Sequence, residues 1–249
     1  MTPIALDESS LRRGVRILAR RDPALAAIAR QYGAPPLWAR EPGFATLVHM
    51  IVEQQVSLAS ARAVFERLRA ALPAFEPTSF LALDDAAFKR VGITRQKTTY
   101  ARELANAIAS NALDLHGLAS LDDAAVHAAL TRIKGIGLWT SNVYLLMALG
   151  RPDAFPASDI ALLAAVHRVK KLRTRPTPER LERLAEAWRP WRAVAARLLW
   201  HFYLSEKATR GAPATHGQAG MMNPTARADD PARARQAAAA ALPSPGRGS

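Results

Sequence analysis

A glycine-containing turn between two short apolar segments constrains the fold of this chain more than any other feature. The turn lies in Leu130–Thr140, which reads LTRIKGIGLWT and contains Gly135 and Gly137. Glycine permits a positive φ angle and close backbone approach, and Asp122 upstream is a suitable N-cap for a helix. The pattern therefore predicts two helices joined by a Gly-x-Gly turn, together covering about residues 122–149.

Free backbone N–H groups at the start of the second helix would point outward with the positive end of the helix dipole. Such a site binds phosphate without reading base sequence, so the turn is a candidate clamp for a DNA backbone. An ordinary helical hairpin would contain the same glycines. The feature that favours DNA is Asp159, a carboxylate 22 residues after Gly137, which precedes a predicted helix at 160–169. Taken alone, Asp159 would be interpreted as a simple N-cap.

The overall charge also indicates a polyanionic partner. Lys and Arg number 34 against 21 Asp and Glu, which gives a net charge of +13 and a pI near 11. Residues 207–249 contain six of the basic and two of the acidic side chains, so 28 basic and 19 acidic residues remain in 1–206. The positive charge therefore belongs mainly to the part expected to fold, and nucleic acid is the expected partner.

Helical periodicity and capping residues continue along the chain, and strand signals are absent. Apolar residues at helical spacing follow a cap or a first-turn proline in most segments. We therefore predict an all-α domain at 1–206 and a disordered Ala/Pro/Arg-rich tail at 207–249. The pattern breaks at Pro73 and Pro77, and the other expected helices cover residues 11–20, 23–32, 44–52, 58–72, 84–91, 94–108, 177–188 and 194–202.

Composition excludes several classes of protein. The chain has no cysteine, which excludes disulfides, thiolate nucleophiles and an iron–sulfur cluster. The six histidines lack the spacing of a helical metal site. No run of 18 apolar residues occurs, and Met1–Gly14 lacks the apolar core of a signal peptide. We therefore expect a cytoplasmic protein that associates with the nucleoid through DNA and not with a membrane.

Four motifs resemble those of the helix-hairpin-helix (HhH-GPD) DNA glycosylase superfamily. They are Ile51–Ser57, Ile133–Thr140, Phe155–Asp159 and Trp188–Trp200, in the family's order and spacing. Within the superfamily the chain is most similar to the 3-methyladenine DNA glycosylase II group, over most of residues 10–205. The resemblance implies two helical lobes with a cleft for DNA and a base between them, and it makes the folded part a catalytic domain.

The resemblance implies a monomeric base-excision-repair enzyme that binds double-stranded DNA containing damaged bases. It would hydrolyse the N-glycosidic bond of alkylated purines such as 3-methyladenine and 7-methylguanine. Bifunctional relatives carry a nucleophilic lysine two residues after the second glycine, and this position is Trp139 here, so a monofunctional enzyme is expected. The alternatives are a glycosylase for oxidised or deaminated bases and a non-catalytic HhH DNA-binding module, although a binding module has no need of Asp159.

The family's motifs also imply roles for individual residues. Asp159 would be the catalytic carboxylate, which stabilises positive charge on the deoxyribose as the base departs and serves as a candidate base for water. Trp139, Trp200 and Tyr144 would form an aromatic pocket for the flipped base. Alkylated purines carry positive charge, which an indole face attracts.

DNA contacts are expected at the hairpin and at the turn after Val52. The family places its duplex-inserting residue at Gln55, next to Gln54, and Lys97 lies in the first turn of a predicted helix, where a bound phosphate would offset its charge. Glu53 departs from the family's usual glycine, and its carboxylate should be turned away from DNA or paired. The hairpin residues expected to contact DNA are Lys134, Gly135, Ile136, Gly137 and Thr140.

The resemblance further suggests a monovalent cation, Na⁺ or K⁺, at the hairpin. Its ligands would be the backbone carbonyls of Thr131, Ile133 and Ile136, and it would bridge to a DNA phosphate. Beyond this ion, no cofactor is expected.

Overall fold

The computed structural model describes residues 5–211, and every regular element in that range is helical. The elements in chain order are α1 (Glu8–Arg21), α2 (Pro23–Tyr32), α3 (Phe44–Glu53), α4 (Leu58–Ala70), α5 (Pro77–Leu81), α6 (Asp85–Val91), α7 (Arg95–Ala109), η1 (Gly117–Ser120), α8 (Asp123–Thr131), α9 (Leu138–Met147), α10 (Ile160–Val169), α11 (Pro178–Ala185), η2 (Glu186–Trp188) and α12 (Arg192–Gly211). The predicted all-α fold is confirmed for this part of the chain. None of its helices is long and apolar enough to cross a membrane.

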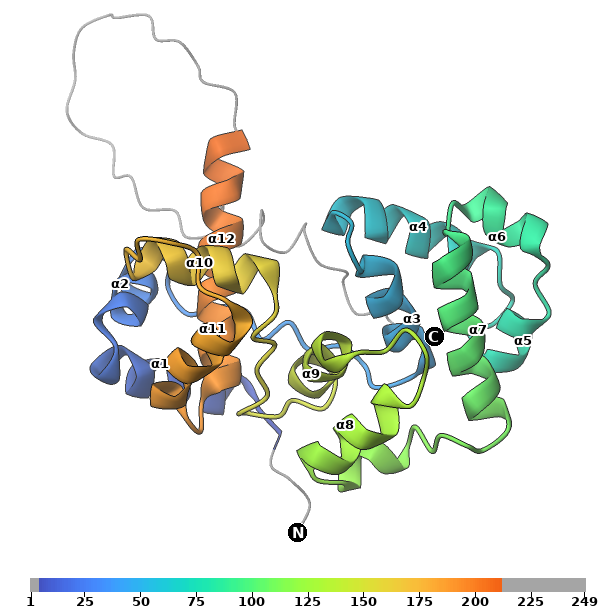
Figure 1. Cartoon of the computed structure of the whole chain (residues 1–249), viewed down its shortest axis with the longest axis horizontal. Coiled ribbons are helices and arrows are strands. Elements are labelled where there is room, and N and C mark those ends of the chain that lie inside the picture. Colours follow the sequence, from blue (N-terminus) through green and yellow to red (C-terminus); the bar gives the residue numbers. More distant parts are fainter. Residues whose placement is uncertain (1–4, 212–249) are drawn as a thin grey trace, which may run out of the picture.

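These helices form two lobes that meet at α9 (Figure 1). One lobe contains α3 to α9. The other combines α1 and α2 with α10, α11 and α12, and both α2 and α10 pack on α12. The chain leaves the second lobe after α2 and returns to it after α9. This lobe is therefore complete only when α12 has joined it.

Capping side chains begin the helices largely where the sequence predicted. Asp22 caps α2 and Ser57 caps α4 through their side chains. The first helix starts earlier than expected, because Asp7 and Ser10 form a capping box. The short helix α5 was not predicted. Pro77 occupies its first position, where the missing N–H group is harmless, instead of breaking the chain.

The predicted boundary of the carboxy-terminal tail is wrong by a few residues. Helix α12 continues to Gly211, so residues 207–211 are helical. Glu206 anchors this end of the helix, since it accepts a hydrogen bond from the Tyr32 hydroxyl at 2.6 Å and pairs with Arg168. The rest of the predicted tail, 212–249, lies outside the described residues.

A buried arginine on α12 joins the two lobes. Arg197 is 1% exposed, and burial lowers its pKa to about 10. Its Nε donates to the carbonyl of Leu37 at 2.8 Å, and its Nη2 donates to the carbonyl of Leu146 at 2.7 Å. Leu146 lies near the end of α9, where a helix carbonyl has no intrahelical partner. One side chain thus satisfies backbone groups from α9 and from the segment between α2 and α3.

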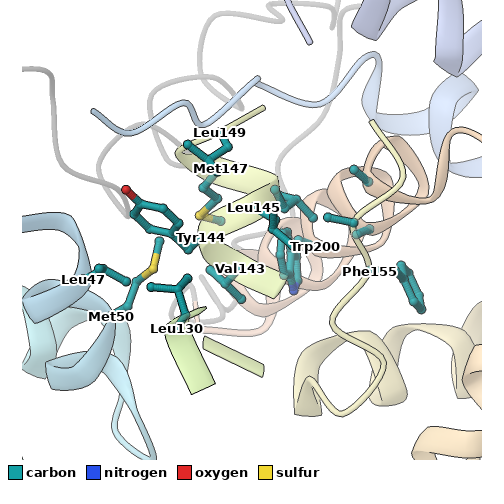
Figure 2. Close-up of a cluster of buried hydrophobic side chains, with 14 of the residues drawn as sticks. Leu47, Met50, Leu130, Val143, Tyr144, Leu145, Met147, Leu149, Phe155 and Trp200 are labelled. Atoms are coloured by element: carbon teal, nitrogen blue, oxygen red, sulfur yellow. The ribbon is translucent and has the colours of Figure 1, made fainter. Parts of the chain in front are cut away.

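Helix α9 supplies the core on both sides of the junction. Figure 2 shows Tyr144 on the same side of α9 as Leu47 and Met50, while Leu145 lies near Trp200 on the other side. All of these side chains belong to one contiguous apolar core. The start of α9 is therefore held firmly relative to both lobes.

Candidate active site at the lobe junction

Asp159 lies where the two lobes meet and begins α10 as its N-cap. Its Oδ1 accepts hydrogen bonds from the Leu162 N–H at 3.0 Å and from the Trp200 indole N–H at 3.0 Å. Its Oδ2 accepts a hydrogen bond from the Trp139 indole N–H at 2.9 Å. The Asp159 carboxylate thus accepts three N–H donors, one from the backbone and two from indole rings.

The two indoles come from different lobes. Trp139 lies in the first turn of α9 and is partly exposed, whereas Trp200 lies on α12 and is buried. The sequence predicted that both belong to one site with Asp159, and the structure brings the three together. Their contact through hydrogen bonds to the carboxylate was not predicted.

Two exposed apolar residues directly follow Gly137 and Asp159 in the chain, and the sequence did not single them out as site residues. Leu138 follows the hairpin and is 65% exposed, and Ile160 follows Asp159 and is 69% exposed. Each occupies the first position of its helix, α9 or α10. A large apolar side chain that departs from the buried stripe of its helix was the available signal. Helices α9 and α10 therefore each begin with an exposed apolar side chain.

Tyr144 does not belong to this site, contrary to the prediction. Its side chain is 0% exposed and packs in the core against α3, and burial raises its pKa to about 12. Tyr144 follows Trp139 by five positions, which turns it by roughly 140° around an α-helix. The two rings therefore face different directions, and Tyr144 is unavailable to a base.

The two hairpin glycines have different reasons to be glycine. Gly135 has φ +92°, and a Cβ atom there would lie 2.1 Å from the ring of Tyr100. Gly137 has φ −95°, so it does not use the positive φ that glycine permits, and a Cβ atom there would meet nothing within 4 Å. No side chain caps α9, which begins after Gly137. Gly135 is thus required by packing, whereas Gly137 keeps the start of α9 open.

This difference gives a matched pair of substitutions. Gly135→Ala should lower the melting temperature by several degrees, because the methyl group collides with Tyr100 and the φ angle is strained. Gly137→Ala should leave the melting temperature nearly unchanged and weaken binding to duplex DNA, because the methyl group obstructs close approach of a phosphate. Thermal denaturation and fluorescence anisotropy with a labelled duplex measure both effects. Equal loss of stability in the two variants would contradict this assignment.

The residues predicted to contact DNA divide into exposed and internal ones. The exposed ones include Gln55, Lys134 and Gly137. The others use their polar atoms within the protein, which the sequence analysis did not foresee. The ammonium of Lys97 donates a hydrogen bond to the carbonyl of Val52 at 2.7 Å. The side-chain amide of Gln54 donates to the carbonyl of Gly135 and to the hydroxyl of Thr140. The Thr140 side chain is buried, and Ile136 is buried with its N–H donated to Ile133.

Glu53 is paired, which is one of the two arrangements expected for a carboxylate at this position. Its carboxylate accepts from both terminal nitrogens of Arg40, at 2.7 and 3.0 Å, and both side chains are largely buried. His49 lies 3.6 Å away, and burial lowers the pKa of its imidazole. The negative charge of Glu53 is therefore compensated and need not repel a phosphate.

The proposed cation ligands are neutral oxygens at the hairpin turn. The carbonyl of Ile133 accepts the N–H of Ile136 at 3.0 Å and retains a second lone pair. Neutral carbonyls suit a monovalent cation better than a transition metal. Among residues 5–211 no group of three or more His, Cys, Asp or Glu side chains is arranged to hold a metal.

An open pocket of about 510 Å³ lies beside the loop that precedes Asp159, but it is not a base site. Neither Asp159 nor the two tryptophans line it. Its carboxylates disfavour the approach of a DNA phosphate. The charged residues that line it are Asp123, Asp153, Glu179, Glu182 and Arg192.

A match to a known protein family covers the hairpin and Asp159. Residues 48–190 match the family described as HhH-GPD superfamily base excision DNA repair protein. The chain belongs to this superfamily. The matched region contains the turn at Gln55, the hairpin and Asp159.

Among curated proteins, the DNA-3-methyladenine glycosylase of Bacillus subtilis is 26% identical over 203 residues, which cover 74% of this chain and 64% of that protein. DNA-3-methyladenine glycosylase 1 of Schizosaccharomyces pombe is 27% identical over 165 residues, which cover 65% of this chain and 72% of that protein. The chain thus spans just under two thirds of the length of the first of these relatives.

Solved structures confirm the HhH-GPD fold. The Schizosaccharomyces pombe 3-methyladenine DNA glycosylase in complex with abasic DNA matches with a TM-score of 0.67 at 23% identity, covering 78% of this chain and 97% of that one. The DNA-3-methyladenine glycosidase of Bacillus halodurans matches with a TM-score of 0.65 at 26% identity, covering 78% and 91% of the two chains.

Proposed function

We propose that this protein is a monofunctional DNA glycosylase that hydrolyses the N-glycosidic bond of alkylated purines in double-stranded DNA. The observation that carries the proposal is the Asp159 carboxylate, which lies at the lobe junction and accepts hydrogen bonds from both Trp139 and Trp200. The names of the relatives, DNA-3-methyladenine glycosylases, support this substrate class.

In this mechanism the damaged nucleotide leaves the duplex before its base is cleaved. Gln55 fills the gap, and the flipped base approaches the partly exposed Trp139. An alkylated purine is cationic, so it is attracted by an indole face and is already a good leaving group. Positive charge then develops on the deoxyribose, where ionised Asp159 stabilises it and can accept a proton from the attacking water.

The reaction should stop at an abasic site. Trp139 occupies the family's lysine position, and its indole N–H donates a hydrogen bond to Asp159. The nearest lysine in the hairpin, Lys134, is exposed, and a solvated ammonium is a poor nucleophile. No Schiff base is therefore expected.

The proposal extends to a monovalent cation on the carbonyls of Thr131, Ile133 and Ile136, where it would supply positive charge to a DNA phosphate. It also extends to a monomeric state on DNA. Exchange of Na⁺ or K⁺ for tetramethylammonium at constant ionic strength should weaken duplex binding if the ion is held.

A panel of duplexes, each with one modified base, tests the function. We expect release of 3-methyladenine and 7-methylguanine, with strand breaks only after alkali, and no protein–DNA adduct when borohydride is present. Release of only oxidised or deaminated bases would overturn the substrate class. Duplex binding without release of any base would favour a non-catalytic module.

The hydrogen bond from Trp200 to Asp159 gives a further prediction. Trp200→Phe removes this donor and should lower the single-turnover excision rate roughly tenfold or more, the expected size for a bond to a charged group. Trp188→Phe is the matched control, because the Trp188 indole also donates to a helix-capping carboxylate, that of Asp22, at 2.8 Å. This control should lose stability without a comparable loss of rate. Equal rates in the two variants would contradict the assigned role of Trp200.

A further inference from the structure

The turn that joins α3 to α4, Gln54–Ser57, has a backbone that its own sequence does not favour. Gln55 has φ +59°, in the left-handed region that non-glycine residues rarely occupy. Its side chain is exposed, and the neighbouring Val56 is 45% exposed. A turn of this kind persists only where the surrounding structure holds it.

Gln54 fastens this turn to the hairpin. Its amide nitrogen donates to the carbonyl of Gly135 at 2.9 Å and to the hydroxyl of Thr140 at 3.0 Å. Gly135 lies in the hairpin turn and Thr140 in the first turn of α9. One amide group therefore engages both parts of the hairpin that surround the open start of α9, more than 80 residues away in sequence.

Two other side chains support the same turn from elsewhere. Lys97 donates to the carbonyl of Val52 at the end of α3, and Arg40 binds Glu53. Neither of these contacts ends on the hairpin. The direct polar connection between the exposed Gln55 and the hairpin thus runs through its neighbour, Gln54.

We propose that Gln54 is a positioning residue that couples phosphate binding at the hairpin to insertion of Gln55 into the duplex. The inference rests on the proposed function. With Gln54 in place, the hairpin and the turn form one rigid unit, so the hairpin's grip on the DNA backbone sets where Gln55 enters the base stack. Without the two hydrogen bonds, the turn must be ordered on DNA in a separate step, which weakens insertion.

A double-mutant cycle measures this coupling in the full chain with Asp159→Asn, where excision does not interfere. The probe is a duplex with 7-methylguanine next to 2-aminopurine, whose fluorescence rises when the neighbouring base leaves the stack. Gln55→Ala and Gly137→Ala are introduced each alone and then both together, once with Gln54 present and once with Gln54→Met. With Gln54 present, the combined effect on flipping should differ from the product of the single effects by at least about threefold. With Gln54→Met, the effects should multiply.

Two further variants keep the result interpretable. Thr140→Val removes one of the two acceptors of Gln54 and should reduce the coupling to an intermediate value. Arg67→Met removes a side-chain bond to the carbonyl of Val91 in the same lobe, away from the hairpin, and should retain full coupling. Unchanged coupling in Gln54→Met, or its loss in Arg67→Met, would overturn this inference alone. Absence of flipping with every variant, the parent included, would overturn the proposed function as well.

Discussion

Replacing Asp159 with asparagine is expected to lower the rate of base excision by at least about a hundredfold, the size seen when a preorganised electrostatic group is removed. Asparagine is also a good N-cap, so α10 should still form. It carries no charge, however, and cannot stabilise the positive deoxyribose of the transition state. Binding to duplex DNA should survive, because the phosphate contacts that we propose lie at the hairpin.

Single-turnover excision and duplex affinity, measured on the same preparations, separate these effects. Asp22→Asn is a close control, since Asp22 also caps a helix and also accepts an indole N–H, that of Trp188. It should lower stability, because Asp22 pairs with Lys170, and leave the rate per folded molecule unchanged. A near-normal excision rate in Asp159→Asn would remove the central observation of the proposed function.

Replacing Arg197 with methionine is expected to lower the free energy of unfolding by about 2–6 kcal/mol, because two buried backbone carbonyls lose their hydrogen-bond donor. Methionine fills much of the volume of the arginine stem but donates no hydrogen bond. The carbonyls of Leu37 and Leu146 would then be buried without these donors, each at an unfavourable free energy of about 1–3 kcal/mol.

Denaturation with urea, with the slope checked for two-state behaviour, measures the change. Arg67→Met serves as the control, because Arg67 donates to one carbonyl from a more exposed position. Its replacement should lower the free energy of unfolding by about 1 kcal/mol. If Arg197→Met were no more destabilising than this control, the interlobe role of Arg197 would be wrong. The excision rate per folded molecule of Arg197→Met reports whether the lobe junction also positions Asp159.

Local features of the sequence determined most of the helices. Helices α2, α4 and α7 begin at or within one residue of their predicted starts, because Asp22, Ser57 and Thr94 cap them and a cap bonds to an N–H group two or three residues away. Gly135 has the positive φ that glycine permits in such a turn. The family's motifs likewise placed Asp159 at the start of α10, since motif and helix start lie in one short segment.

Contacts between distant segments were decided only by the tertiary structure. From the sequence, the amide of Gln54 and the ammonium of Lys97 could both contact DNA, yet in the structure both donate hydrogen bonds to backbone carbonyls of the protein. Tyr144 is buried in the core. The indole donors on Asp159 come from positions 20 and 41 residues away. Residue type and spacing specify which groups a segment can offer. The packing of two lobes, one of them built from both ends of the described chain, decides whether those groups meet each other or remain open to a ligand.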